Sequence, residues 1–302
     1  MRKVLLASTA LFALGSVSAM AADISISGSS EIVLDMGDSA TADDSGLTTE
    51  HDIAITFSNT TDSGISTSMV YGMNDNGNAT DDLQTTISGD FGSFRYTAAG
   101  DEHALSAVDV EGAGTAEETF NRSTAAQGQG ASTLNSIGGI GNQTVTYVLP
   151  SLVDGLYVAA SAANGTGANG EAAAYAVQYD TGAFRLVYGQ LKGQVVTTTH
   201  VGVAASFGDV GVQLAKNSDD TANEDRAATI MGITYAMGDI TLGYESEQIE
   251  NGTATSDEKH TAFGATYAVA PGLSASLTMA ESDRMQGQTD SATTSIGLHV
   301  SF

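Results

Sequence analysis

Apolar and polar positions alternate with a period of two along most of this chain. The last residues show it clearly: one parity holds Ile296, Leu298, Val300 and Phe302, and the other holds Ser295, Gly297, His299 and Ser301. Successive side chains of a β-strand point to opposite faces, so the pattern predicts a strand with one apolar face and one small or polar face. A strand of this kind at the carboxyl terminus is typical of a closed barrel in lipid, because the last strand must pair with the first.

Sixteen segments alternate in this way. They cover residues 23–35, 46–58, 64–73, 82–89, 92–99, 141–149, 155–163, 171–180, 183–192, 195–207, 210–217, 226–237, 239–249, 258–269, 272–281 and 291–302. Every second connection, beginning after the second segment, is a short turn rich in Asp, Gly and Pro, the residues that tight hairpins use. The other connections are mostly longer and acidic. This layout predicts an all-β fold, a transmembrane antiparallel β-barrel of sixteen strands.

Aromatic residues gather near the short turns and the terminus. They are Phe57, Phe94, Tyr179, Phe184, Phe207, Tyr235, Tyr267 and Phe302. Most share the parity of the apolar residues on their strand, and aromatic rings collect at membrane–water interfaces. We therefore expect a girdle at the short-turn rim; the alternative is that these rings cap the core of a soluble barrel.

The opposite parity describes the lumen. Its predicted members are Ser66, Ser68, Thr144, Thr146, Gln178, Arg185, His200, Ser274, Ser276, Thr278, Ser295 and His299. A barrel of sixteen strands leaves a water-filled channel rather than a packed interior. The geometry predicts a diffusion pore.

The amino terminus reads as a secretory signal peptide. Met1-Arg-Lys is a basic start, residues 4–17 are almost continuously apolar, and Ala19-Met-Ala21 is a small-x-small cleavage site. Such a segment is too short for a stop-transfer helix. We expect cleavage after Ala21, or after Ala22, which leaves residues 22–302 as one barrel domain.

Composition and charge narrow the function. Charged residues make up 15% of the chain, with 35 Gly and 2 Pro, which in a soluble protein would mean an all-β domain with a thin core. Loss of Arg2 and Lys3 turns the net charge of −26 into −28. Such a chain repels nucleic acid and attracts cations. The absence of cysteine excludes a disulfide framework.

One connection stands apart, residues 100–140. Its acids are Asp101, Glu102, Asp109, Glu111, Glu117 and Glu118, with Arg122 as a lone base, followed by a stretch rich in Gly, Ser, Gln and Asn. Loops this long are usually functional or disordered. Two interpretations stay open: a constriction loop folded into the barrel, or a solvated acidic surface loop.

The segment Asp90-Phe-Gly-Ser-Phe-Arg-Tyr96, a turn and strand leading into this connection, resembles the corresponding part of the general porins of Gram-negative outer membranes. The resemblance covers the whole mature chain in layout, and it implies a homotrimer in the outer membrane, in contact with lipid and lipopolysaccharide. It also implies that residues 100–140 narrow the pore and that Arg95 is a wall charge facing the loop acids. The predicted bases near the constriction are Arg95, Arg122 and Arg185. Unlike enterobacterial members, the chain lacks a Pro-Glu-Phe-Gly-Gly-like segment and has few predicted wall bases.

Other chemistry is sparse. The five histidines show no metal-ligand spacing, and no Ser/His/Asp constellation falls on one rim, so we expect no enzyme activity and no cofactor. Acid pairs in the loops, such as Asp43-Asp44, could still bind a divalent cation such as calcium and bridge to lipopolysaccharide.

The expected function is therefore a passive, cation-selective pore for ions and small hydrophilic solutes. The main alternative is an outer-membrane adhesin or structural barrel with a plugged lumen, and a more distant one is a soluble secreted β-protein. Phe302 is expected to act in barrel closure and assembly.

Overall fold

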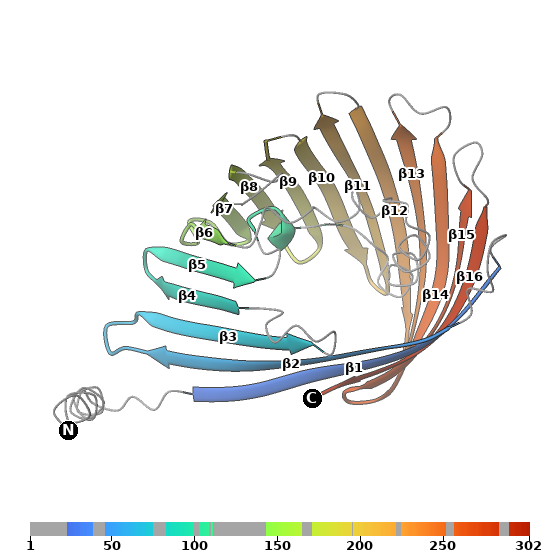
Figure 1. The fold of residues 1–302 in the computed structure, drawn as a ribbon, viewed down its shortest axis with the longest axis horizontal. Coiled ribbons are helices and arrows are strands. Elements are labelled where there is room, and N and C mark those ends of the chain that lie inside the picture. Colours follow the sequence, from blue (N-terminus) through green and yellow to red (C-terminus); the bar gives the residue numbers. More distant parts are fainter. Residues whose placement is uncertain are drawn as a thin grey trace, which may run out of the picture.

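In a computed structural model the chain forms a closed barrel in which each strand pairs antiparallel with its neighbours in sequence (Figure 1). The structure describes residues 23–38, 46–74, 83–99, 103–108, 110, 143–164, 171–194, 196–221, 225–251, 257–283 and 290–302. The predicted signal peptide lies outside these residues and stays a prediction. Within them, no helix is long and apolar enough to cross a membrane.

The sixteen strands follow the alternating segments one for one. They are β1 (Asp23–Asp38), β2 (Gly46–Thr60), β3 (Ser66–Asn74), β4 (Leu83–Gly89), β5 (Gly92–Ala99), β6 (Thr144–Val148), β7 (Leu156–Asn164), β8 (Glu171–Asp180), β9 (Phe184–Lys192), β10 (Val196–Phe207), β11 (Val210–Thr221), β12 (Asp225–Met237), β13 (Ile240–Asn251), β14 (Glu258–Ala270), β15 (Leu273–Asp283) and β16 (Ser291–Ser301). One short 3₁₀ helix, η1 (Ser106–Val108), follows β5. The predicted all-β barrel of sixteen strands is confirmed.

Several boundaries differ from those that the pattern predicted. β11 continues to Thr221 and β15 to Asp283, each beyond the predicted end, whereas β6 is shorter than predicted. The last predicted residue of β15, Glu281, and the additional Asp283 lie on the outer face, after the apolar Leu277 and Met279. Strand pairing therefore continues past the apolar band, where alternation of apolar and polar residues no longer marks it.

The barrel closes between β1 and β16. In this seam Leu34 pairs with Ile296 and Ile32 with Leu298. The backbone of Phe302 continues the pairing: Gly28 N–H donates to Phe302 O at 2.9 Å, and Phe302 N–H donates to Gly28 O at 3.0 Å. A Cβ added to Gly28 would lie 2.7 Å from Cζ of the Phe302 ring and 2.9 Å from the backbone oxygen of Asp52, so a larger residue here would require the ring or β2 to shift.

The two faces of the wall match the two parities. All eight aromatic residues of the predicted girdle are exposed, from 37% for Phe57 to 73% for Phe302, on the same face as Leu186, Leu214, Leu277 and Leu298. The polar positions assigned to the lumen are all half-buried or buried. An outer face this apolar suits hydrocarbon, and the inner face suits water and polar contacts.

Seven short turns join the strands at one rim, and each contains one glycine with positive φ: Gly64, Gly92, Gly155, Gly182, Gly208, Gly238 and Gly272. Gly155 also lies against β8, because a Cβ there would be 2.0 Å from the backbone oxygen of Asp180. Gly182 has a similar φ of 80° but nothing within 4 Å of a Cβ position.

This pair of turns supports a prediction. Gly182→Ala should destabilise the barrel by about 1–2 kcal/mol, the cost of a left-handed conformation with a Cβ. Gly155→Ala should cost clearly more, because backbone must also move away from the new methyl group. Urea unfolding from lipid vesicles measures both values, and equal losses would show that the close approach at Gly155 is unimportant.

Candidate pore constriction

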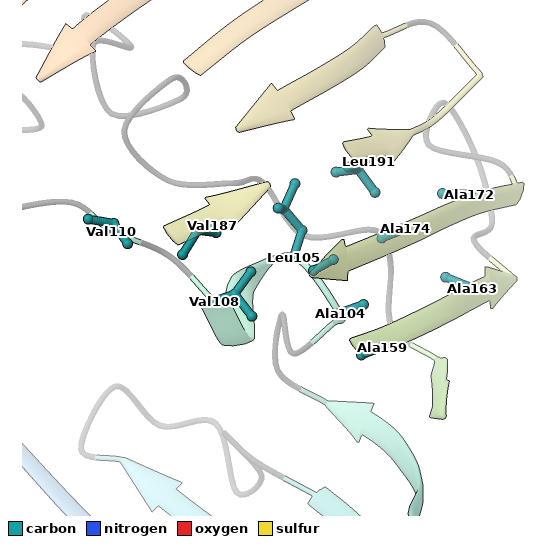
Figure 2. Packing of buried hydrophobic residues seen from close by; sticks show 11 residues of the cluster. Ala104, Leu105, Val108, Val110, Ala159, Ala163, Ala172, Ala174, Val187 and Leu191 are labelled. Carbon is teal, nitrogen blue, oxygen red and sulfur yellow. The ribbon is translucent and has the colours of Figure 1, made fainter. Parts of the chain in front are cut away.

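The described start of the long connection lies inside the barrel. Ala104, Leu105, Val108 and Val110 form one buried cluster with inward side chains of the wall: Ala159 and Ala163 on β7, Ala172, Ala174 and Ala176 on β8, and Val187 and Leu191 on β9. Figure 1 shows η1 within the space that the sheet encloses, and Figure 2 shows Ala104, Leu105 and Val108 beside these strands. We name residues 103–108 and 110 the inner segment.

Small wall residues allow this close packing. A Cβ on Gly189 of β9 would lie 2.4 Å from Cδ1 of Leu105, and Leu105 is fully buried. Alternation along the strands predicts small or polar residues at inward positions, so the apolar patch here differs from the expectation. A signal was present: β9 carries Leu186, Val187 and Leu191 on both parities, as a strand covered on both faces does.

Polar contacts hold the inner segment at its beginning. Ala104 N–H donates to Oγ of Ser161 on β7 at 2.7 Å, and Ser161 Oγ lies 2.7 Å from Oγ1 of Thr146 on β6. The ring of His103 closes the following turn, because its Nδ1 accepts from the N–H groups of Leu105 at 3.2 Å and Ser106 at 3.3 Å. The start of the connection is thus fixed to β6 and β7.

A second contact holds the inner segment at its end. Val110 N–H donates to Nε2 of His200 on β10 at 3.3 Å. The other ring nitrogen, Nδ1, lies 2.5 Å from Oδ1 of Asn217 on β11. Because an amide oxygen only accepts, the hydrogen of a neutral imidazole sits on Nδ1 and leaves Nε2 free to accept.

The predicted constriction residues fall into two groups. Asp101, Glu102, Asp109, Glu111, Glu117, Glu118 and Arg122 lie outside the described residues, and their role stays a prediction. Arg95 lies on β5 between the exposed Phe94 and Tyr96, half-buried on the inward face opposite Thr146. Arg95 thus lies on the lumen face, and its expected role as a wall charge facing the loop acids stays a prediction.

Arg185 lies near the rim of short turns. Its Nε donates to Oδ2 of Asp180 at 3.0 Å, across the turn between β8 and β9. The other oxygen of this carboxylate, Oδ1, accepts from Gly182 N–H at 2.7 Å. Arg185 faces inward two residues before Val187, so it lies between the short-turn rim and the inner segment. It also stabilises its own turn.

The inner wall carries carboxylates that the sequence analysis did not single out. On β1 and β2, Glu31 pairs in register with Glu50, and both line an open cavity of about 890 Å³ together with Asp52 and His299. In a closed order of sixteen strands, β1 and β16 lie half-way round from β8 and β9. This acidic wall therefore lies across the lumen from the inner segment.

A second group lies on β13 and β14. Glu245, Glu247, Glu258 and His260 are buried on the inward face, and Oε2 of Glu258 lies 3.5 Å from Nε2 of His260. The signal for the first two was their alternation with the exposed Tyr244, which assigns them to the polar parity. Among the residues that the structure describes, no three His, Asp or Glu side chains are placed to hold a metal ion.

A closed sheet with an apolar outer face is the geometry of a barrel in a membrane, and the inner segment lies inside this barrel. A sequence comparison decides the family. The sequence model of the Gram-negative porin family matches residues 7–302. The chain belongs to the Gram-negative porin family. This porin is accordingly an outer-membrane channel protein, and its family is one of channels rather than enzymes.

Solved structures agree in fold. A porin structure refined at 1.8 Å covers 93% of this chain and the whole of its own, with a TM-score of 0.70 and 16% identity. A variant of the Rhodopseudomonas blastica porin gives a TM-score of 0.66 at 15% identity, with the same coverage. The Vibrio cholerae outer membrane protein OmpT, in a form lacking one loop, gives 0.64 at 17% identity, again with 93% and 100% coverage. No curated protein matches this porin's sequence.

Proposed function

We propose that this porin is a passive, water-filled, cation-selective channel for ions and small hydrophilic solutes, narrowed by residues 100–140. The observation that carries the proposal is the position of the inner segment. The inner segment packs on inward-facing residues of β7 to β9, so this part of the connection lies inside the barrel.

The charge of the inner wall supports the choice of cations. The described inward positions include the acids Glu31, Asp35, Glu50, Asp52, Asp180, Asp219, Glu245, Glu247 and Glu258, against the arginines Arg95, Arg185 and Arg226. Carboxylates that line a narrow passage concentrate cations and exclude anions, and low-dielectric walls strengthen the effect. The predicted loop acids would strengthen the negative electrostatic potential that these wall carboxylates already produce.

We also propose that the porin assembles as a homotrimer and contacts lipid and lipopolysaccharide. The resemblance to trimeric porins supports the trimer. Outward charges on the long-loop side of the apolar band, such as Lys216, Lys259 and Asp283, are exposed where polar headgroups would meet the barrel. Chemical crosslinking in native membranes tests the trimer.

Selectivity provides the sharpest test of the proposed function. In planar bilayers under a salt gradient, we expect steady conductance steps and a reversal potential whose sign shows that cations are more permeant than anions. Selectivity should weaken as salt rises, because the screening length falls from about 10 Å at 0.1 M to about 3 Å at 1 M. Replacing Asp109, Glu111, Glu117 and Glu118 by Asn or Gln should move the reversal potential toward zero.

The matched control neutralises four exposed acids of the short turns, Asp62, Asp90, Asp154 and Asp209, and should leave the reversal potential nearly unchanged. If the loop variant keeps the parent potential, the loop acids do not line the pore. A parent that inserts but never conducts would instead indicate a plugged barrel.

A further inference from the structure

We propose that His200 is a positioning residue of the pore: it holds Val110, and through Val110 the inner segment, against the wall. The inference rests on the proposed function and deepens it, because it names a contact that holds the inner segment of the narrowing connection against the wall. His200 is fully buried and lies 90 positions after Val110 in sequence, so the contact joins the loop to a distant strand.

The wall is shaped to receive Val110 at this point. Gly202 follows His200 on the same face of β10, and a Cβ added to it would lie 2.7 Å from Cβ of Val110 and 3.2 Å from Nε2 of His200. Any larger residue at position 202 would push Val110 off the ring. His200, Gly202 and Asn217 thus form a notch that fits the backbone of the inner segment.

The hydrogen bonds of the notch depend on the charge of the ring. Asn217 Oδ1 takes the Nδ1 hydrogen, so Nε2 accepts from Val110 N–H only while the imidazole is neutral. Protonation would place a second hydrogen on Nε2, facing the Val110 N–H. Two donors then oppose each other, and the inner segment loses this attachment as the pH falls.

Charged groups around the notch come from several elements. On β11, Asp219 is the next inward residue after Asn217 and accepts from Oγ1 of Thr198 at 2.6 Å. The inner segment contributes His103, and Asp109 and Glu111 flank Val110 in sequence. On β9, Gly189 lies opposite His200 in register, and the nearest inward charge is Arg185.

The test uses the full porin in planar bilayers, with His200→Leu, His200→Gln and Gly202→Ala. Leucine offers no acceptor, so the inner segment should move into the passage, and conductance should be lower and noisier than the parent's at every pH. Glutamine offers an accepting carbonyl oxygen and a donating NH2 group, which can replace Nε2 and Nδ1, so it should keep the parent conductance. Gly202→Ala leaves the ring intact but crowds Val110, and should resemble His200→Leu.

The pH profile separates positioning from a merely structural role. On acidification from about pH 8 to about pH 4, across the usual range of histidine titration, the parent should show a step to the lower, noisier state. His200→Gln should lose this step, because its amide does not titrate. Heat-resistant gel mobility confirms that each variant is a folded barrel.

Two results would overturn the proposal: parent-like conductance and noise in His200→Leu, or a full acid step in His200→Gln. Failure of the proposed function looks different. The parent porin could lack cation selectivity while its His200 variants still change conductance as expected. That result would contradict the proposed selectivity and support the proposed role of His200.

Discussion

Replacing Leu277 by Arg should destabilise the barrel by about 2–4 kcal/mol, the cost of a guanidinium near the middle of the bilayer. Leu277 is 42% exposed on the outer face of β15, between Ala265 of β14 and Ile296 of β16 in register. The neighbouring outward positions of its strand, Ala275 and Met279, are apolar as well, so the new charge has no polar partner beside it.

Ser274→Arg on the same strand is the matched control. Ser274 faces inward and lines the open cavity of about 890 Å³ that also contains Glu31 and Glu50. An arginine there has room, water and nearby carboxylates, so it should cost little stability while it changes conductance. Ser276 would be a poorer control, because its Oγ lies 2.9 Å from Nε2 of His299. Equal losses for Leu277→Arg and Ser274→Arg in urea unfolding from lipid would show that the two faces are wrongly assigned.

Deleting Phe302 should sharply reduce the yield of folded barrel. The deletion removes both backbone hydrogen bonds to Gly28 and the ring that lies over it. A sheet edge without partners is heavily penalised in lipid, since no water replaces the lost bonds. An aromatic anchor at the interface is lost at the same time. Heat-resistant mobility on gels, after refolding into vesicles, measures the folded fraction.

Two further variants separate the ring from the backbone. Phe302→Tyr keeps both and should assemble like the parent. Phe302→Ala keeps the hydrogen bonds to Gly28 but loses the ring, so its yield should lie between that of the parent and that of the deletion. A deletion variant that assembles normally would show that the terminal residue has no role in closure.

The sequence by itself determined the wall of this porin. Local patterns predict where the strands lie, which side chains point outward and where the turns occur. Ile296 and Leu298 alternate with Ser295 and Gly297, and Gly182 allows the left-handed turn after β8. Each such feature depends on residues within a few positions of one another. Lipid then makes the pattern strict within the apolar band, because the outward side chains of that band meet hydrocarbon. The ends of β11 and β15 extend beyond the predicted segments, where polar outward residues leave no alternation, and β6 is shorter than predicted.

The tertiary structure alone decided what lies within the wall. Val187 and Leu191 face inward and yet are apolar, because Leu105 and Val108 cover them from a connection about eighty residues earlier. His200 is a lumen residue by parity, but its partner Val110 is visible only once the barrel closes. Glu31 and Glu50 come to face the inner segment only because sixteen strands return the chain to its start. The partners of these inward side chains come from distant parts of the chain. A pattern with a period of two describes only neighbouring residues, so it cannot predict these contacts.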